Sequence, residues 1–229
     1  MIRIDGWNME NEQKSESSPP ALRPRLRGRL HLWGFVVSIF AGIEIIHRAP
    51  NNADFYAVGI YAFALSAMLG TSAALHVPKW SVKARRRMRR ADHSTIFLAV
   101  AGTYTPVAVI GLSGNTRAII LWVVWGGSLL GVAQQMIWLD APKWVSALVY
   151  LALGWAAVWV LPDLYHSSGA WALTLIVVGG ILYSVGAAAY ATKRPDPWPK
   201  TFGYHEVFHS FVLAAAVCNY VAISYFIMK

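Results

Sequence analysis

The residues best suited to chemistry are histidines at the ends of long apolar segments. His205 and His209 are four residues apart, so on a helix their imidazole rings project from one face and can share a metal ion. Ionisable side chains at membrane depth are costly, and they are candidates for function by default. The pair therefore predicts a metal-binding helix that takes its remaining ligands from elsewhere in the chain.

Two further positions complete a candidate zinc site. His76 lies one helical turn after Ser72 on the same face, and Asp92 begins a later apolar segment. Three protein ligands plus one water form the catalytic arrangement of zinc, and His76 is the best third ligand. Asp92 is expected either to bind the metal directly or to orient the water or a ligand imidazole. Adjacent helical residues point about 100° apart, so His93 is expected to be a neighbour rather than a ligand.

The run from His205 to His209 also matches the His-Glu-x-x-His signature of metalloproteases, in which the glutamate is the general base. That class of enzyme takes its third ligand from downstream. Here the chain after His209 holds no His, Asp or Glu, which excludes the usual protease arrangement. Two interpretations of Glu206 remain open, a base and a charge at the membrane interface. Since Cys218 is the single cysteine and lies deep in the last apolar segment, a thiolate site is excluded.

The composition indicates what must position these residues. Of 229 residues, 56% are hydrophobic and 14% charged, whereas a soluble domain carries about a quarter charged residues. A membrane-spanning helix needs about 20 apolar residues. The sequence therefore predicts an all-α bundle of seven transmembrane helices, at roughly 30–47, 54–76, 92–112, 117–139, 143–161, 169–191 and 205–228. The single histidines outside the candidate site are interpreted as interfacial residues: His31, His47 and His166.

The distribution of lysine and arginine predicts the orientation. Residues 1–29 form a basic tail, expected to be flexible and cytoplasmic, and 30–229 form the transmembrane domain. Lys and Arg near helix ends stay on the cytoplasmic side. The tail and the even-numbered loops hold 17 of them, and the opposite side holds 3. We therefore expect a cytoplasmic N-terminus and an extracytoplasmic C-terminus in a cell (plasma or inner) membrane.

The same topology gathers the candidate residues at one face. The second segment ends, and the third and seventh begin, on the cytoplasmic side, so the histidines and Asp92 are expected at one depth. The basic run Lys83–Arg90 joins two membrane segments. Its predicted partners are anionic lipid headgroups, and nucleic acid is not expected as a partner.

Together these motifs resemble the hemolysin III branch of the progestin and adiponectin receptor family, within the superfamily that includes alkaline ceramidases. The resemblance covers all seven segments. It rests on Ser72-Ala73-Ala74-Leu75-His76, on Asp92-His93-Ser94 with Ala101-Gly102-Thr103-Tyr104-Thr105-Pro106, and on His205-Glu206-Val207-Phe208-His209-Ser210. It implies that His76, His205 and His209 bind zinc and that Asp92 acts at the site through water.

Three functions follow as expectations. The first is a zinc-dependent membrane hydrolase acting on a lipid amide, such as a ceramide-like lipid with release of a fatty acid, in membrane lipid homeostasis. Asp92 would then orient or deprotonate the water, and Ser72 would hydrogen-bond the water or the oxyanion. The second is a non-enzymatic lipid sensor whose zinc ties helices together. The third is a pore-forming hemolysin, which few intramembrane charges support.

Overall fold

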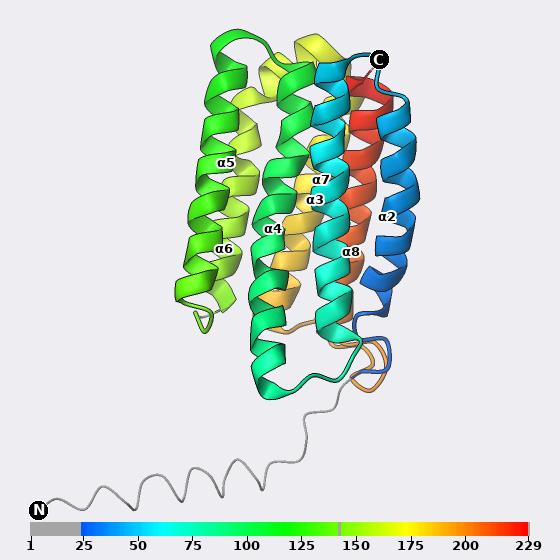
Figure 1. Cartoon of the computed structure of the whole chain (residues 1–229), viewed down its shortest axis with the longest axis vertical. Coiled ribbons are helices and arrows are strands. Elements are labelled where there is room, and N and C mark those ends of the chain that lie inside the picture. Colours follow the sequence, from blue (N-terminus) through cyan, green and yellow to red (C-terminus); the bar gives the residue numbers. More distant parts are fainter. Residues whose placement is uncertain (1–23, 142, 229) are drawn as a thin grey trace, which may run out of the picture.

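The computed structural model describes residues 24–141 and 143–228, and this part of the chain is a bundle of helices with no β-strand (Figure 1). The elements are α2 (Arg29–His47), α3 (Asn52–His76), α4 (Val82–Gly111), α5 (Gly114–Ile137), α6 (Lys143–Gly154), the 3₁₀ segment η1 (Trp155–Val160), α7 (Leu161–Thr192), α8 (Tyr204–Val221) and the π-helical segment η2 (Ala222–Ile227). Residues 1–23 of the predicted tail and the terminal Lys229 lie outside the described residues.

Six helices of the described chain are long and apolar enough to cross a membrane. One of these spans covers Ala147–Thr192, 46 residues. At 1.5 Å per residue that length is about 69 Å, more than twice the ~30 Å hydrocarbon core. Gly169 interrupts it with φ 83° and ψ 178°, outside the helical region. In Figure 1 the chain runs along the bundle through α6 and returns through α7.

The outer surface of the bundle is apolar. Large side chains such as Trp122, Ile137 and Trp159 are exposed. A helix that is hydrophobic on its outer face as well as its inner one is typical of a membrane span. Inside, a cluster that includes Tyr61 and Leu164 fills the half of the bundle remote from His76. Because the outer surface is apolar, polar side chains within the bundle must find hydrogen-bond partners in the protein.

The N-terminal end of α4 differs from the prediction. The basic run Lys83–Arg90 was expected to lie in a loop, but it is helical, because α4 begins at Val82, ten residues before Asp92. Ser81 caps this helix, its Oγ accepting the Ala84 N–H at 3.4 Å. Lysine and arginine are good helix formers, and serine is a preferred N-cap. The basic side chains therefore extend from the end of the bundle on a rigid helix.

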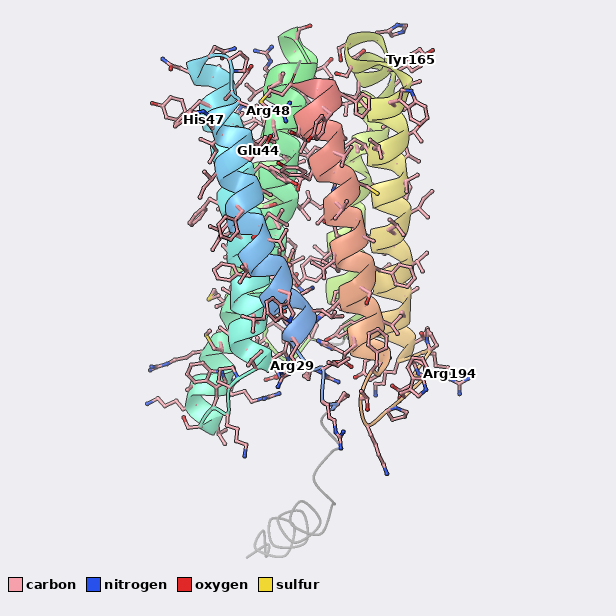
Figure 2. The ribbon with its side chains drawn as sticks, turned by 90° about the vertical axis from the view of Figure 1, so that its right-hand side faces the viewer. Arg29, Glu44, His47, Arg48, Tyr165 and Arg194 are labelled. Carbon is pink, nitrogen blue, oxygen red and sulfur yellow. The ribbon has the colours of Figure 1, made fainter. Side chains whose placement is uncertain are left out.

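The two ends of the bundle carry different residues. Figure 2 shows Arg29 and Arg194 at one end and His47, Arg48 and Tyr165 at the other. The helices alternate in direction, so α3 ends where α4 and α8 begin (Figure 1). The expected convergence of these three helix ends is observed.

Small residues allow the helices to approach closely. A Cβ at Gly102 of α4 would lie 2.5 Å from the Ala64 Cβ of α3, and one at Gly131 of α5 would lie 2.2 Å from the Phe97 ring of α4. Phe97 is fully buried, so its ring has little room to shift. Close backbone approach at small residues is a recurrent packing mode of membrane helices.

We predict that Gly131→Ala destabilises the protein, because its methyl group would overlap the Phe97 ring. Overpacking of this kind costs about 1–3 kcal/mol, or a melting temperature lower by roughly 2–12 °C in a chain of this size. Gly126→Ala is the matched control on the same helix, since nothing lies within 4 Å of its added Cβ. Thermal unfolding of both variants in detergent makes the comparison, and equal melting temperatures would contradict the close contact.

Candidate metal centre

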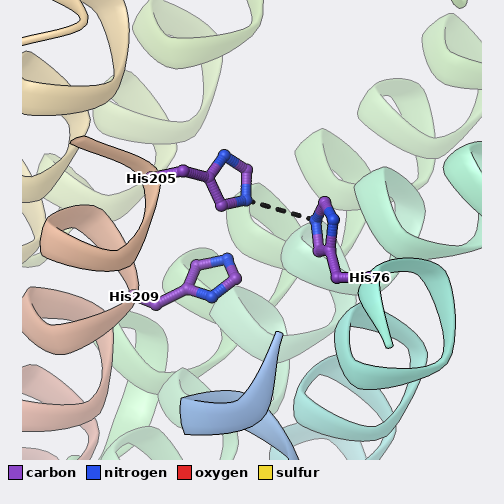
Figure 3. Close-up of side chains that lie close together, drawn as sticks. All are labelled: His76, His205 and His209. Atoms are coloured by element: carbon purple, nitrogen blue, oxygen red, sulfur yellow. Dashed lines mark hydrogen bonds between the residues drawn. The ribbon is translucent and has the colours of Figure 1, made fainter. Parts of the chain in front are cut away.

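Three histidines meet at the end of the bundle that carries Arg29. His76 is the last residue of α3, and His205 and His209 lie in the first two turns of α8 (Figure 3). One ring nitrogen from each lies within 4.8 Å of the others, and the Nε2 atoms of His76 and His205 are 3.2 Å apart. These three residues could hold a metal ion.

The start of α8 explains how two of these rings come to share a face. The helix begins at Tyr204, whose backbone N–H donates to the Asp196 carboxylate at 2.8 Å. Residues four apart on a helix lie above one another, and the rings of His205 and His209 have centroids 4.5 Å apart. The spacing read in the sequence therefore produces the expected juxtaposition.

The nitrogen spacing fits a zinc ion. Zinc binds imidazole nitrogen at about 2.0–2.1 Å in tetrahedral geometry, which places two ligand nitrogens about 3.3 Å apart. The 3.2 Å between the Nε2 atoms of His76 and His205 is close to this value. Imidazole is a ligand type that zinc prefers. The donor set is compatible with zinc, and the nitrogen of His209 lies within 4.8 Å of the other two.

Ser72 and Asp92 lie beside the histidines. Both are buried, with Asp92 8% exposed. The side chains of Ser72 and Asp92 lie close to each other. The two residues also line the same cavity as the three histidines. The structure thus brings together all five residues that the sequence singled out, while their chemical roles stay a prediction.

His93 has a different environment. Its Nδ1 lies 3.3 Å from the Gln135 Oε1, and its carbonyl accepts the Tyr150 hydroxyl at 3.2 Å. The side chain is outside the group of three candidate ligands. Its expected position as a neighbour of the site agrees with this geometry.

Glu206 fits neither interpretation left open by the sequence. It is fully buried rather than at an interface. Its carboxylate accepts the Arg27 Nε–H at 2.6 Å and the Gly203 N–H at 2.9 Å. A carboxylate held by a guanidinium and by the first turn of its own helix is a structural anchor. Glu206 is therefore a poor candidate for the base, which leaves Asp92.

His31 is a residue of the site that the sequence interpretation missed. His47 and His166 are exposed, as expected of interfacial residues. The same interpretation of His31 is wrong, because its ring is 2% exposed and stacks on the ring of His209, with centroids 3.6 Å apart and planes 11° apart. A signal was present: His31 opens the first apolar segment, at the end of the bundle where the topology had already placed the ligands.

A cavity of about 550 Å³ leads away from the histidines into the bundle. Its polar end holds Ser72, Asp92 and the three candidate ligands, and its far part is lined by apolar residues such as Val107, Leu164 and Ile176. The volume lies within the roughly 300–1,000 Å³ of small-molecule pockets. The cavity therefore combines a polar terminus with a long apolar wall.

Residues 21–220 match the family of haemolysin-III-related proteins. Among similar proteins, the hemolysin-3 homolog of Bacillus subtilis is 29% identical over 87% of this chain and 92% of its own length. The monocyte to macrophage differentiation factor of Homo sapiens is 22% identical over 82% of this chain and 78% of its length. The adiponectin receptor protein of Drosophila melanogaster is 27% identical over 85% of this chain, which spans 48% of the receptor.

We predict that purified protein carries about one zinc per chain and that His205→Ala and His209→Ala each lose most of it. Removing one of three imidazoles leaves too few protein ligands for a stable site. His166→Ala is the matched control, because that ring is exposed at the opposite end of the bundle. Elemental analysis of the four proteins provides the measurement. Equal zinc content in all of them would reject the histidine site.

Proposed function

The chain belongs to the haemolysin-III-related family, the hemolysin III branch of the progestin and adiponectin receptor family, and we propose that it is a zinc-dependent membrane hydrolase acting on a lipid amide. The observation that carries the proposal is the position of the three imidazoles in a cavity whose lining is otherwise mainly apolar. A ceramide-like lipid, with one amide and a long acyl chain, matches that division of polar and apolar walls.

The proposed reaction assigns a role to each residue. His76, His205 and His209 hold the zinc ion. When bound, zinc polarises the amide carbonyl and lowers the pKa of a water molecule towards ~7. Asp92 takes the proton of the attacking water, and Ser72, which lies close to the Asp92 carboxylate, holds it in place. The acyl chain occupies the apolar cavity, and cleavage yields a fatty acid and an amine that accepts the proton from Asp92.

We further propose seven membrane crossings, with the N-terminus in the cytoplasm. The 46-residue span supports two crossings, since Gly169 breaks it and the chain reverses within it. The basic helical start of α4 lies at the end where Arg29 is found, which the charge rule assigns to the cytoplasm. The proposed location is the cell membrane, with the Lys83–Arg90 side chains in contact with anionic lipid headgroups.

A second function, a lipid sensor with structural zinc, has one observation in its favour. The candidate ligands His76 and His205 are 129 positions apart in the chain, so a shared ion would tie α3 to α8. A structural site is closed by protein ligands, whereas a catalytic site keeps a position for water. Three imidazoles leave the fourth coordination position of zinc to be filled. A variant at Asp92 therefore distinguishes the two functions.

We predict that Asp92→Asn lowers lipid-amide hydrolysis by roughly 10²–10⁴-fold, the range for loss of a general base. Asparagine keeps the size and one acceptor oxygen, so zinc should stay bound or weaken by about 10–100-fold, as for residues that act on a metal through its ligands or water. Fatty-acid release from long-chain ceramides, zinc content and melting temperature are measured on the same preparations.

The outcomes separate the two functions. Wild-type protein with full zinc and no release from any long-chain amide tested would refute the hydrolase and favour the sensor. Release that persists undiminished in Asp92→Asn would keep the hydrolase and reject Asp92 as its base. Glu206→Gln then becomes informative, because Glu206 is the carboxylate in the first turn of α8, next to the candidate ligand His205.

We predict opposite locations for the two ends of the chain. A reporter fused to the N-terminus should be cytoplasmic, and one fused to the C-terminus should be extracytoplasmic, because seven crossings place the ends on different sides. Fusions truncated after residue 168 and after residue 200 should also report opposite sides, since the part of α7 from Gly169 to Thr192 lies between these points. The same location for both truncations would show that residues 169–192 do not cross.

A further inference from the structure

His31 contacts two parts of the candidate centre at once. On one side its ring lies against His209, with centroids 3.6 Å apart and planes 11° apart. On the other side its Nδ1 shares a hydrogen bond of 2.8 Å with the Ser72 hydroxyl. All three side chains are buried. The ring is therefore held on its face and on its edge by residues of the site.

The stacking geometry excludes His31 as a further ligand of the same ion. The lone pair of an imidazole nitrogen lies in the plane of its ring. The planes of His31 and His209 are nearly parallel, with ring centroids 3.6 Å apart, so their lone pairs do not converge on one point within the ~2.0–2.1 Å of a zinc–nitrogen bond. If His209 binds the ion, His31 acts on it only through His209.

The backbone around His31 is shaped to bring α2 close to the site. Gly28 has φ 79°, and a Cβ there would lie 2.5 Å from the His76 Cβ. Further along α2, a Cβ at Gly34 would lie 2.5 Å from a Leu213 methyl group of α8. A side chain at Gly28 would meet the Cβ and the backbone of His76, whereas at Gly34 it would displace a methyl group of Leu213. Two glycines thus flank His31 and allow its ring to reach His209.

We propose that His31 is a positioning residue of the metal centre, which fixes the ring plane of His209 by stacking while Ser72 holds His31 in place. The proposal rests on the zinc site described above. Ser72 is hydrogen-bonded to His31 and lies close to Asp92. The contacts therefore run without interruption from Asp92 through Ser72 and His31 to the candidate ligand His209.

This arrangement has a mechanical consequence. A histidine side chain rotates about two bonds, and a ligand that rotates freely loses conformational entropy on binding the ion. A flat ring stacked on His209 restricts that rotation before the metal arrives. Residues that orient metal ligands typically change metal affinity by about 10–100-fold when they are removed. The stack predicts an effect of this size from a residue that never touches the ion.

Three variants separate positioning from simple core packing. His31→Leu removes both the stacked ring and the hydrogen bond to Ser72. His31→Phe restores a flat ring and leaves the hydrogen bond absent. Ser38→Ala is the matched control on α2, because Ser38 is also buried and bonds to the Phe35 carbonyl and to Ser66, away from the histidines. His31→Met is a second replacement without a ring, for use if the leucine variant does not fold.

The measurements are zinc affinity, the visible absorption spectrum of the cobalt-substituted protein, and the melting temperature. We expect His31→Leu to bind zinc about 10–100-fold more weakly than the wild type and to show an altered cobalt spectrum. His31→Phe should recover most of the affinity. Ser38→Ala should change only the melting temperature, because it disturbs α2 without touching a ring of the site.

Each contrary result has a definite meaning. His31→Leu, or His31→Met in its place, with wild-type affinity and an unchanged cobalt spectrum would show that His31 only fills the core. A loss that His31→Phe does not restore would reject stacking as its cause. A wild-type protein that binds neither zinc nor cobalt would overturn the metal centre itself, and this inference with it.

Discussion

Polar side chains inside a bundle with an apolar exterior have no water to bind. Each buried hydrogen-bonding group left without a partner costs about 1–3 kcal/mol, and an isolated buried charge costs far more. At one end of this bundle four imidazoles, a serine and an aspartate are buried together: His31, Ser72, His76, Asp92, His205 and His209. They contact one another only if α2, α3, α4 and α8 meet in one register, and even there the Nε2 of His31 and the Nδ1 of His209 have no hydrogen-bond partner among the described residues. The rest of the architecture depends on that requirement.

The segment before α2 contributes to the same end of the bundle. Backbone N–H groups of Arg25 and Leu26 donate to the carbonyls of Lys200 and Thr201 at 3.0 and 3.1 Å. Arg27 pairs with the fully buried Glu206. Breaking a buried ion pair by removing one partner costs about 3–5 kcal/mol. Residues that the sequence assigned to a flexible tail thus hold the first turn of α8, on which two candidate ligands lie.

Much of the fold and of the candidate site could be predicted from residue types and spacing. A helical spacing of four placed His205 and His209 on one face, and the count of basic residues placed His76 and Asp92 at the same end. These inferences needed only the helical period and the alternation of membrane segments. Six membrane-competent helices are present in the described chain, and the reversal at Gly169 depends on a backbone conformation that apolar composition does not reveal.

Contacts between rings and across helices could not be predicted in this way. The stack of His31 on His209 depends on the approach of α2, which Gly28 and Gly34 allow through missing Cβ atoms rather than through any charge or period. The burial of Glu206 depends on Arg27, 179 positions earlier in the chain. Such pairings are set by packing in three dimensions, so a histidine or glutamate near a helix end looks interfacial until its partner is known.

If imidazoles from α3 and α8 bind one zinc ion, X-ray absorption at the zinc edge of the purified protein should detect them. We expect nitrogen or oxygen neighbours at about 2.0–2.1 Å with the outer-shell scattering of about three imidazole rings. A spectrum without imidazole scattering, or with sulfur at about 2.3 Å, would contradict this expectation.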